Sequence, residues 1–475
     1  MAAADIDLCY LSAGEAIAAF KSKSLSPVEL MTAIIARIEA VNPAINAFAN
    51  TYFERALEQA AKAEIKYQKT DGRLRALEGV PLVIKDLHPI QGHITTLGSR
   101  AFADYRPDHS APTVARLLRA GAILHGQSTT PEFGSKGCTS SPLWGITYNP
   151  WNQKFSAGGS SGGSAAALSA GMTILADGTD GGGSIRSPSA ANGTFGYKPP
   201  FGRNPLDAGV ALEDFVSYGP MTRSVADAAL MQNVTSGPHP DDICSLRNRL
   251  RLPDKFDGIK GWRAAFSMDL GYFEIDPVVQ KNTLAALDVF RGLGCEVREV
   301  DVGWSLSALD VFTTHWEAMM AAGFEAMLPR WRYEFDPWVT SMIERGMRHD
   351  AARYYRLNQT RSEMYRKIAP ILESHDILIC PTTAIPAVTP DHDHANPNFR
   401  INGKIVSPAI QMYLTYPFNL LGQLPAASVP SGTCPNTDIP TGLQVIARSY
   451  DDLRVFRAAA AYEAANPWRG RRPNL

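Results

Sequence analysis

Residues 157–188 read AGGSSGGSAAALSAGMTILADGTDGGGSIRSP, which places two glycine- and serine-rich runs on either side of an alanine-rich stretch. Glycine allows positive φ angles and close backbone approach, so main-chain N–H groups in such loops can converge on one ligand oxygen. The alanines at 165–170 predict a short helix between the two runs. Serine hydroxyls held on loops of this kind indicate acyl-transfer chemistry.

Other glycine-rich segments explain these runs less well. A Walker A loop needs Gly-Lys-Ser/Thr, and no lysine lies between Lys154 and Lys198. Neither run has the G-x-G-x-x-G spacing of a dinucleotide-binding loop. A flexible linker would not alternate with a helix and with apolar strand residues such as 173–175. On these residues alone, catalysis by a serine and a binding role both remain open.

A serine becomes a useful nucleophile only beside a base, and the sequence offers a lysine for that role. Residues 78–87, EGVPLVIKDL, bring Lys85 to the end of an apolar, β-branched run. Burial lowers the pKa of an ammonium group, and a neutral lysine can accept a proton. His88 and His93 follow the same run, and we expect structural roles for them. Serine–lysine pairs are an alternative to serine–histidine pairs, so Lys85 is the candidate base.

No motif for a metal or an organic cofactor is found, and none is expected. His392 and His394 lie in DHDH, residues 391–394, between two prolines and without helical spacing. That segment is best interpreted as a polar loop. The six cysteines form no C-x-x-C pair, which favours reduced thiols.

Three motifs together resemble the amidase signature family: EGVPLVIKDL around Lys85, GGSSGGS at 158–164 and GTDGGGSIR at 178–186. The spacing from Lys85 to Ser160 and on to Ser184 agrees with that family, and the likeness extends over nearly the whole chain. The resemblance implies an α/β protein of the amidase signature fold, with a large mixed, mostly parallel sheet covered by helices on both faces. A single domain spanning 1–475 is expected, with a helical part to about 70, a catalytic core to about 250 and a C-terminal part from 251.

The resemblance also implies a Ser–Ser–Lys triad. Ser184 would be the nucleophile that forms the acyl-enzyme. Ser160, expected to follow a cis peptide bond, would pass the proton from Ser184 to Lys85.

Two further groups of residues are expected at the site. The family often has threonine at position 181, where this chain has glycine. The expected oxyanion-hole donors are the N–H groups of Gly181, Gly182, Gly183 and Ser184, and the expected substrate-facing residues are Lys136, Gly137 and Cys138.

The implied function is an amidohydrolase that cleaves a small aryl or alkyl amide through an acyl-serine and releases a carboxylate with ammonia or an amine. One alternative is the glutaminase subunit of an aminoacyl-tRNA amidotransferase. Others are hydrolases of nylon-type oligomers, carbamates or esters. Homodimers are usual in the family, so a homodimer is expected.

Charge and hydropathy limit the partners. The 475 residues include 46 basic and 47 acidic side chains, for a net charge of −1. Without a basic stripe, no nucleic-acid partner is expected. No apolar run approaches the roughly 20 residues that span a bilayer, so no membrane contact is expected. The acidic start of the chain lacks a signal-peptide pattern, which predicts a cytoplasmic protein.

Local patterns predict elements along the chain. Ser26, Pro27 and Glu29 form a capping box that predicts the start of a helix. Residues 304–369 are expected to be largely helical. Their aromatics are open to two interpretations, a cover over the substrate entrance or ordinary core: Trp316, Phe324, Trp331, Tyr333 and Trp338.

Overall fold

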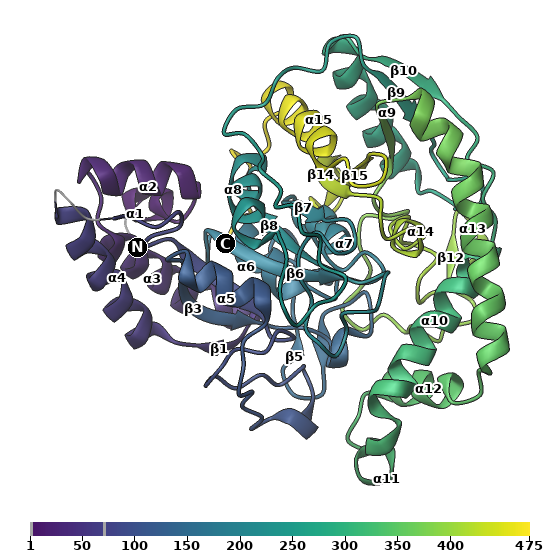
Figure 1. The fold of residues 1–475 in the computed structure, drawn as a ribbon, viewed down its shortest axis with the longest axis horizontal. Coiled ribbons are helices and arrows are strands. Elements are labelled where there is room, and N and C mark those ends of the chain that lie inside the picture. Colours follow the sequence, from purple (N-terminus) through teal and green to yellow (C-terminus); the bar gives the residue numbers. More distant parts are fainter. Residues whose placement is uncertain (1–2, 70–72) are drawn as a thin grey trace.

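The computed structural model describes residues 3–69 and 73–475, which fold around one eleven-stranded sheet (Figure 1). Two small two-stranded sheets lie outside it. In spatial order, the strands of the large sheet are β1 (Phe48–Thr51), β3 (Ile123–Ser128), β2 (Pro81–Lys85), β6 (Leu175–Asp180), β8 (Ser217–Thr222), β7 (Phe195–Lys198), β14 (Ala426–Thr433), β15 (Pro440–Ile446), β11 (Ile377–Pro381), β9 (Arg263–Phe266) and β10 (Glu296–Glu299). The small sheets pair β4 (Ser140–Ser141) with β5 (Gly145–Ile146), and β12 (Arg400–Ile401) with β13 (Lys404–Ile405).

The sheet is mixed, as expected, but the expectation that it is mostly parallel is wrong. Parallel pairs occur in two groups, β3–β2–β6 and β11–β9–β10. The strands between them, from β6 to β11, pair antiparallel, and so does edge strand β1 with β3. Parallel neighbours need a long crossover, whereas β14 and β15 are joined directly by a short loop that fits an antiparallel pair.

Helices cover both faces of the sheet. In β11, Ile377 and Ile379 face a core that includes Phe290 of α9 and Phe456 of α15. The alternate residue Leu378 faces a second core with residues of α10 and α13, as period-2 alternation along a strand requires. The helices of eight or more residues are α2 (Ala13–Ser22), α3 (Pro27–Ile45), α4 (Phe53–Gln68), α5 (Pro112–Arg119), α6 (Gly162–Ser169), α8 (Val225–Thr235), α9 (Pro277–Gly292), α10 (Ser307–Phe324), α12 (Pro337–Gly346), α13 (Ala351–Ser374) and α15 (Asp452–Ala465). The shorter ones are α1 (Ala3–Leu8), α7 (Arg186–Asn192), α11 (Leu328–Trp331) and α14 (Pro417–Leu420). None of the helices within the described ranges is both long and apolar enough to cross a bilayer.

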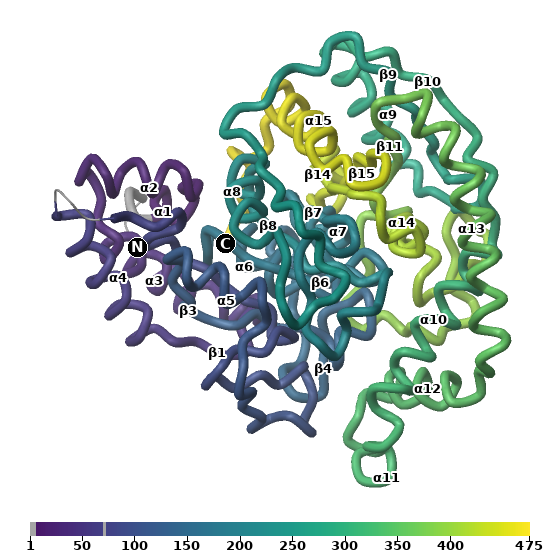
Figure 2. The backbone as a smooth tube through the Cα atoms, viewed as in Figure 1, coloured from purple at the N-terminus to yellow at the C-terminus, as the bar shows by residue number. Residues whose placement is uncertain are grey.

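The C-terminal residues lie beside the N-terminal helices (Figure 2). The guanidinium of Arg37 on α3 donates to the carbonyl of Leu475 at 3.5 Å, and Arg472 forms an ion pair with Asp7 at 2.6 Å. The C-terminal residues therefore join the first helices to the rest of the fold.

The predicted capping box at the start of α3 is confirmed. The side chain of Ser26 accepts the backbone N–H of Glu29, and the side chain of Glu29 accepts the backbone N–H of Ser26.

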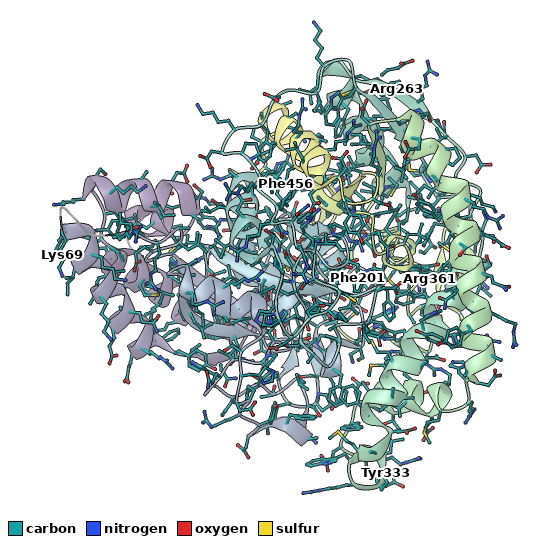
Figure 3. The ribbon with its side chains drawn as sticks, in the orientation of Figure 1. Lys69, Phe201, Arg263, Tyr333, Arg361 and Phe456 are labelled. Atoms are coloured by element: carbon teal, nitrogen blue, oxygen red, sulfur yellow. The ribbon has the colours of Figure 1, made fainter. Side chains whose placement is uncertain are left out.

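Helices α10 to α12 form an arm that ends at Tyr333, which is 95% exposed (Figure 3). The base of the arm packs on Phe133, whose ring stacks on Phe324 with 3.8 Å between centroids. Helices α10 and α12 approach closely at Gly346, where an added Cβ would lie 2.0 Å from the carbonyl oxygen of Glu317. This packing holds α10 against the second glycine-rich run, where Phe312 and Trp316 contact the glycines.

A buried ion pair fixes the second glycine-rich run to the sheet. Arg186 donates to both carboxylate oxygens of Asp180, at 2.9 and 3.0 Å, and neither side chain is exposed to solvent. The same guanidinium donates to Gln444 at 2.7 Å and to Asn419 at 2.6 Å. Asp180 also accepts the backbone N–H of Gly183 at 2.8 Å. Residues from the centre of the sheet and from α14 thus set the shape of the loop that carries Ser184.

We expect Asp180→Asn to lower the free energy of unfolding by about 3–5 kcal/mol, because it leaves the Arg186 guanidinium buried without its counter-charge. The matched control is Asp310→Asn, which breaks an exposed pair with Arg353 and should cost at most about 1 kcal/mol. Urea denaturation followed by tryptophan fluorescence measures both variants. Equal stability losses in the two would contradict this account.

Candidate active site

Lys85 ends β2 inside a compartment closed to solvent. Its Nζ lies 2.7 Å from Ser160 Oγ, 2.9 Å from Ser161 Oγ and 2.8 Å from Thr179 Oγ1. Burial lowers the pKa of the Lys85 ammonium to about 7, although the charges of nearby aspartates act in the opposite direction. A large fraction of Lys85 is therefore a neutral amine near pH 7.

The hydroxyls around this amine do not have equivalent roles. Ser161 donates its proton to the carbonyl oxygen of Thr179 at 3.4 Å, so it accepts a proton from Lys85. A neutral amine has two protons and one lone pair. Ser160 and Thr179 contact the amine as well, so the lone pair faces one of these two hydroxyls.

The first glycine-rich run needs its glycines because other loops press against it. An added Cβ at Gly162 would lie 2.3 Å from Thr139 Oγ1, and one at Gly159 would lie 2.8 Å from the carbonyl oxygen of Lys136. The Gly159–Ser160 peptide bond is cis, as the resemblance implied. Ser160 thus reaches Lys85 from a backbone packed too closely for larger side chains.

Ser184 lies just before α7, at the end of the second run. Gly183 has φ of +123°, which favours glycine. Its N–H is taken by Asp180. In the described part of the chain, the N–H groups of Gly181, Gly182 and Ser184 have no intramolecular acceptor. Of the four expected oxyanion-hole donors, these three are unoccupied.

Aromatic side chains of α10 pack directly on this loop. An added Cβ at Gly181 would lie 2.7 Å from the ring of Trp316, and one at Gly182 would lie 2.6 Å from the ring of Phe312. Glycine at 181, where the family often has threonine, is therefore explained by the indole ring of Trp316 occupying that space. No local sequence pattern linked residue 316 with residue 181.

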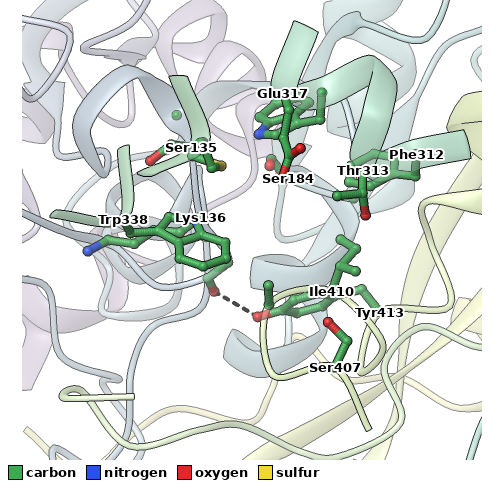
Figure 4. Close-up of a pocket in the computed structure, with 18 of the residues that line it drawn as sticks. Ser135, Lys136, Ser184, Phe312, Thr313, Glu317, Trp338, Ser407, Ile410 and Tyr413 are labelled. Atoms are coloured by element: carbon green, nitrogen blue, oxygen red, sulfur yellow. Dashed lines mark hydrogen bonds between the residues drawn. The ribbon is translucent and has the colours of Figure 1, made fainter. Parts of the chain in front are cut away.

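Two cavities meet at Ser184, and both are also lined by Gly134 and Trp316. The first, of about 250 Å³, lies between the loop that contains Lys136, helices α10 and α12, and the segment that contains Tyr413 (Figure 4). The hydroxyl of Tyr413 donates to the carbonyl oxygen of Gly137 at 3.2 Å. A bound molecule that reached Ser184 could extend into both spaces.

The charged side chains on the walls of the first cavity are paired. Lys136 forms an ion pair with Asp336, and Arg345 forms one with Glu317 at 2.5 Å. Because each charge has its counter-charge, the remaining surface of this cavity is governed by aromatic rings, aliphatic side chains and glycines.

The second cavity, of about 420 Å³, is largely apolar and is the one that Ser160 lines. Asp207 and Glu213 lie on its wall, and burial raises the pKa of both carboxyls. Its apolar lining comes from several elements: Leu87, Leu97, Phe133, Val210, Val216, Met319, Met320 and Phe324.

The structure separates the three residues expected to face the substrate. Lys136 and Gly137 line the first cavity. Cys138 is instead buried in an apolar core and lines neither cavity. Among the aromatics of the helical region, Trp316, Phe324 and Trp338 line a cavity, whereas Trp331 and Tyr333 line neither of these two.

The rings of His392 and His394, the two histidines of the DHDH segment, each contact a backbone carbonyl oxygen. A ring nitrogen of His392 lies 2.8 Å from the carbonyl oxygen of Pro408, and one of His394 lies 3.1 Å from the carbonyl oxygen of His392. Within residues 3–69 and 73–475, no three His, Cys, Asp or Glu side chains gather as a metal site would require.

Comparison with known proteins shows which proteins the chain is similar to. The Amidase family model matches residues 29–456. The chain is 36% identical to an acylamidase of Rhodococcus erythropolis over 98% of both sequences. It is 34% identical to a glutamyl-tRNA(Gln) amidotransferase subunit of Chloroflexus aggregans over 99% of both. A solved bacterial aryl acylamidase of the amidase signature family superposes with a TM-score of 0.90 at 30% identity, covering 97% of this chain and 99% of that one.

The expected fold is confirmed by these matches. The family model and the sequence relatives span nearly all of the chain, and so does the structural match. The chain therefore belongs to the amidase signature family and is a hydrolase of amide C–N bonds.

Proposed function

We propose that the protein hydrolyses a small aryl or alkyl amide through an acyl-enzyme on Ser184, with neutral Lys85 as the base and Ser160 as the bridge between them. One observation carries this proposal. The Nζ of a fully buried lysine lies 2.7 Å from Ser160 Oγ, and Ser160 lines the same cavity as Ser184. A lysine amine that is shielded from water and hydrogen-bonded to a hydroxyl at an open cavity is suited to accept a proton from a nucleophile.

In the first half of the reaction, Ser184 Oγ attacks the amide carbonyl and forms a C–O bond. Its proton passes to Ser160, whose own proton passes to Lys85. The oxyanion that develops accepts hydrogen bonds from the unoccupied N–H groups of Gly181, Gly182 and Ser184. Loss of one such donor typically costs about 10²–10³ in kcat. The C–N bond then breaks, and Lys85 returns the proton through Ser160 to the departing nitrogen.

In the second half, water replaces the amine. Lys85 takes a proton from the water through Ser160, and the water oxygen attacks the acyl carbon. The bond to Ser184 Oγ breaks, and the proton returns to that oxygen. The products are a carboxylic acid and a regenerated serine, and every step uses the same proton path.

The proton path also assigns the two cavities to the two halves of the substrate. The departing amine must lie beside Ser160, which donates its proton, and Ser160 lines the second cavity only. We therefore place the amine part of the substrate in the second cavity and its acyl part in the first. The apolar lining of the second cavity favours aryl or alkyl amines over ammonia.

The similarity to an acylamidase and to an aryl acylamidase supports this substrate class. The similarity to an amidotransferase component keeps glutamine as the second candidate. Nylon-type oligomers, carbamates and esters would fit the same acyl-enzyme chemistry. Release of 4-nitroaniline from its acyl amides, compared with release of ammonia from glutamine, separates the two main candidates. A homodimer and a cytoplasmic location remain predictions.

Ser184→Ala should abolish turnover, by about 10⁴-fold or more in kcat, because the acyl group has no oxygen to bond to. Mass spectrometry after treatment with a fluorophosphonate should find one adduct, on the peptide that contains Ser184. The control Ser187→Ala removes another hydroxyl from the wall of the first cavity and should keep the adduct. An adduct that persists in Ser184→Ala would place the nucleophile elsewhere.

The pH dependence of kcat/KM should report the protonation of Lys85. Below its pKa of about 7 the amine is an ammonium and cannot accept a proton, so the rate should rise with pH through this region and level off above it. Lys85→Ala should lose most of the rate. A wild-type profile that is flat from about pH 5 to 9 would contradict the lysine base.

Narrowing the second cavity should change the preference for the amine part of the substrate, and narrowing the first should change the preference for the acyl part. Val210→Trp narrows the second cavity and should raise KM for amides of bulky amines, with little effect on primary amides of the same acid. Ile410→Trp narrows the first cavity and should instead discriminate against large acyl groups. Steady-state assays with a series that varies one side at a time test this. The reverse pattern would exchange the two assignments.

A further inference from the structure

A carboxyl group and an imidazole lie beside Lys85, and the proposed reaction uses neither. Asp177 is on β6, next to β2, and its Oδ1 accepts the backbone N–H of Lys85 at 2.8 Å. Its Oδ2 lies 3.3 Å from Nε2 of His88. The His88 ring is fully buried and packs edge-on against Tyr218, with 4.3 Å between ring centroids. Neither Asp177 nor His88 lines either cavity.

One of the two facing atoms needs a proton. Among the described residues, neither nitrogen of His88 nor Oδ2 of Asp177 has a hydrogen-bond partner, and the 3.3 Å contact between Nε2 and Oδ2 lacks the geometry of a hydrogen bond. Two buried lone pairs this close repel, and a proton on either atom removes the repulsion. That proton is carried either by the carboxylic acid or by Nε2.

We propose that Asp177 and His88 form a buried acid–imidazole pair that controls how readily Lys85 takes up a proton. Asp177 is then a positioning residue of the reaction, and this inference rests on the proposed function of Lys85 as the base. With one proton on Oδ2 or Nε2 and a second on Nδ1 of His88, the pair carries no net charge. Loss of one proton leaves a carboxylate and a neutral imidazole, so the pair carries one negative charge beside the lysine and favours the ammonium form.

The surroundings favour the uncharged pair. Burial raises the pKa of Asp177, and it lowers the pKa of His88. Burial also raises the pKa of Tyr218 well above its ordinary value, so that phenol stays neutral. Lys85 therefore faces a pair that is uncharged at low pH and gains negative charge as pH rises.

The other carboxyl groups near the lysine are already engaged. Asp180 is neutralised by Arg186 at 2.9 Å. Asp86 follows Lys85 in the chain, and its carboxyl accepts hydrogen bonds from the backbone N–H of Thr96 at 2.8 Å and from the indole N–H of Trp144 at 3.3 Å. The hydroxyls that contact the amine are uncharged. Asp177 accepts a hydrogen bond from the lysine residue itself, and in the described part of the chain no arginine or second lysine forms an ion pair with it.

Two substitutions of this pair should move the pH profile in opposite directions. Asp177→Asn keeps an oxygen for the Lys85 N–H but cannot ionise, so Lys85 loses a charge that favours its ammonium form. The acid limb of kcat/KM should move to lower pH by roughly one unit, with the plateau kcat and KM retained. His88→Asn offers Asp177 an amide N–H that stabilises the carboxylate, so the acid limb should move to higher pH.

The matched control is Asp227→Asn, which removes a buried carboxyl from α8, where it contacts the N-terminal helix α2. This variant should leave the acid limb in its wild-type position. Opposite shifts in the two test variants support the inference. Unshifted limbs, or shifts in one common direction that Asp227→Asn shares, would overturn it. If Asp177→Asn does not fold, the upward shift expected of His88→Asn decides alone.

The same assays separate this inference from the proposed function. If Lys85→Ala and Ser184→Ala retain turnover, the base and nucleophile are wrong and the acid limb belongs to other groups. If both variants are inactive and the acid limb of the test variants is unchanged, only the role of the Asp177–His88 pair is wrong.

Discussion

The burial of the Lys85 amine is the constraint on which the rest of the site depends. An ammonium group transferred from water into a closed compartment loses its hydration, and the protein replaces that hydration with three hydroxyl groups. Hydroxyls bond to an amine without adding charge, so the lysine is solvated and still easily neutralised. Carboxylates in their place would have stabilised the ammonium form, which cannot act as the proposed base.

The glycine-rich runs are the structural consequence of that compartment. The first run brings the hydroxyls of Ser160 and Ser161 to the amine, and the second brings that of Thr179. A loop or a helix packs against each run and leaves no room for a Cβ at its glycines. The second run is also pinned by the Asp180–Arg186 pair to the centre of the sheet. In the proposed reaction, fixed donors around Ser184 would need no reorganisation, which is how preorganised N–H groups stabilise a developing oxyanion.

Helix α10 connects the fold to the specificity of the site. Trp316 packs on Gly181 and lines both cavities, so the residue that restricts the loop also borders both of the proposed substrate spaces. Its neighbours on α10 supply Phe312 to the first cavity and Met320 to the second. A change in the helical arm would therefore alter the proposed substrate cavities without altering the residues of the proposed proton path.

The sequence alone determined the family, the motifs around Lys85, Ser160 and Ser184, and the start of α3, because motif spacing and capping are local properties of the chain. It led to a wrong expectation for the strand directions in the middle of the sheet, which depend on pairings between strands separated in the chain, such as β6 with β8 and β7 with β14. Only the tertiary structure brought Trp316 onto Gly181, placed Cys138 in the core and set His88 against Asp177. These contacts join residues that are far apart in the chain, and they form only when the elements pack together and exclude water. No periodicity or spacing in the sequence therefore encodes them.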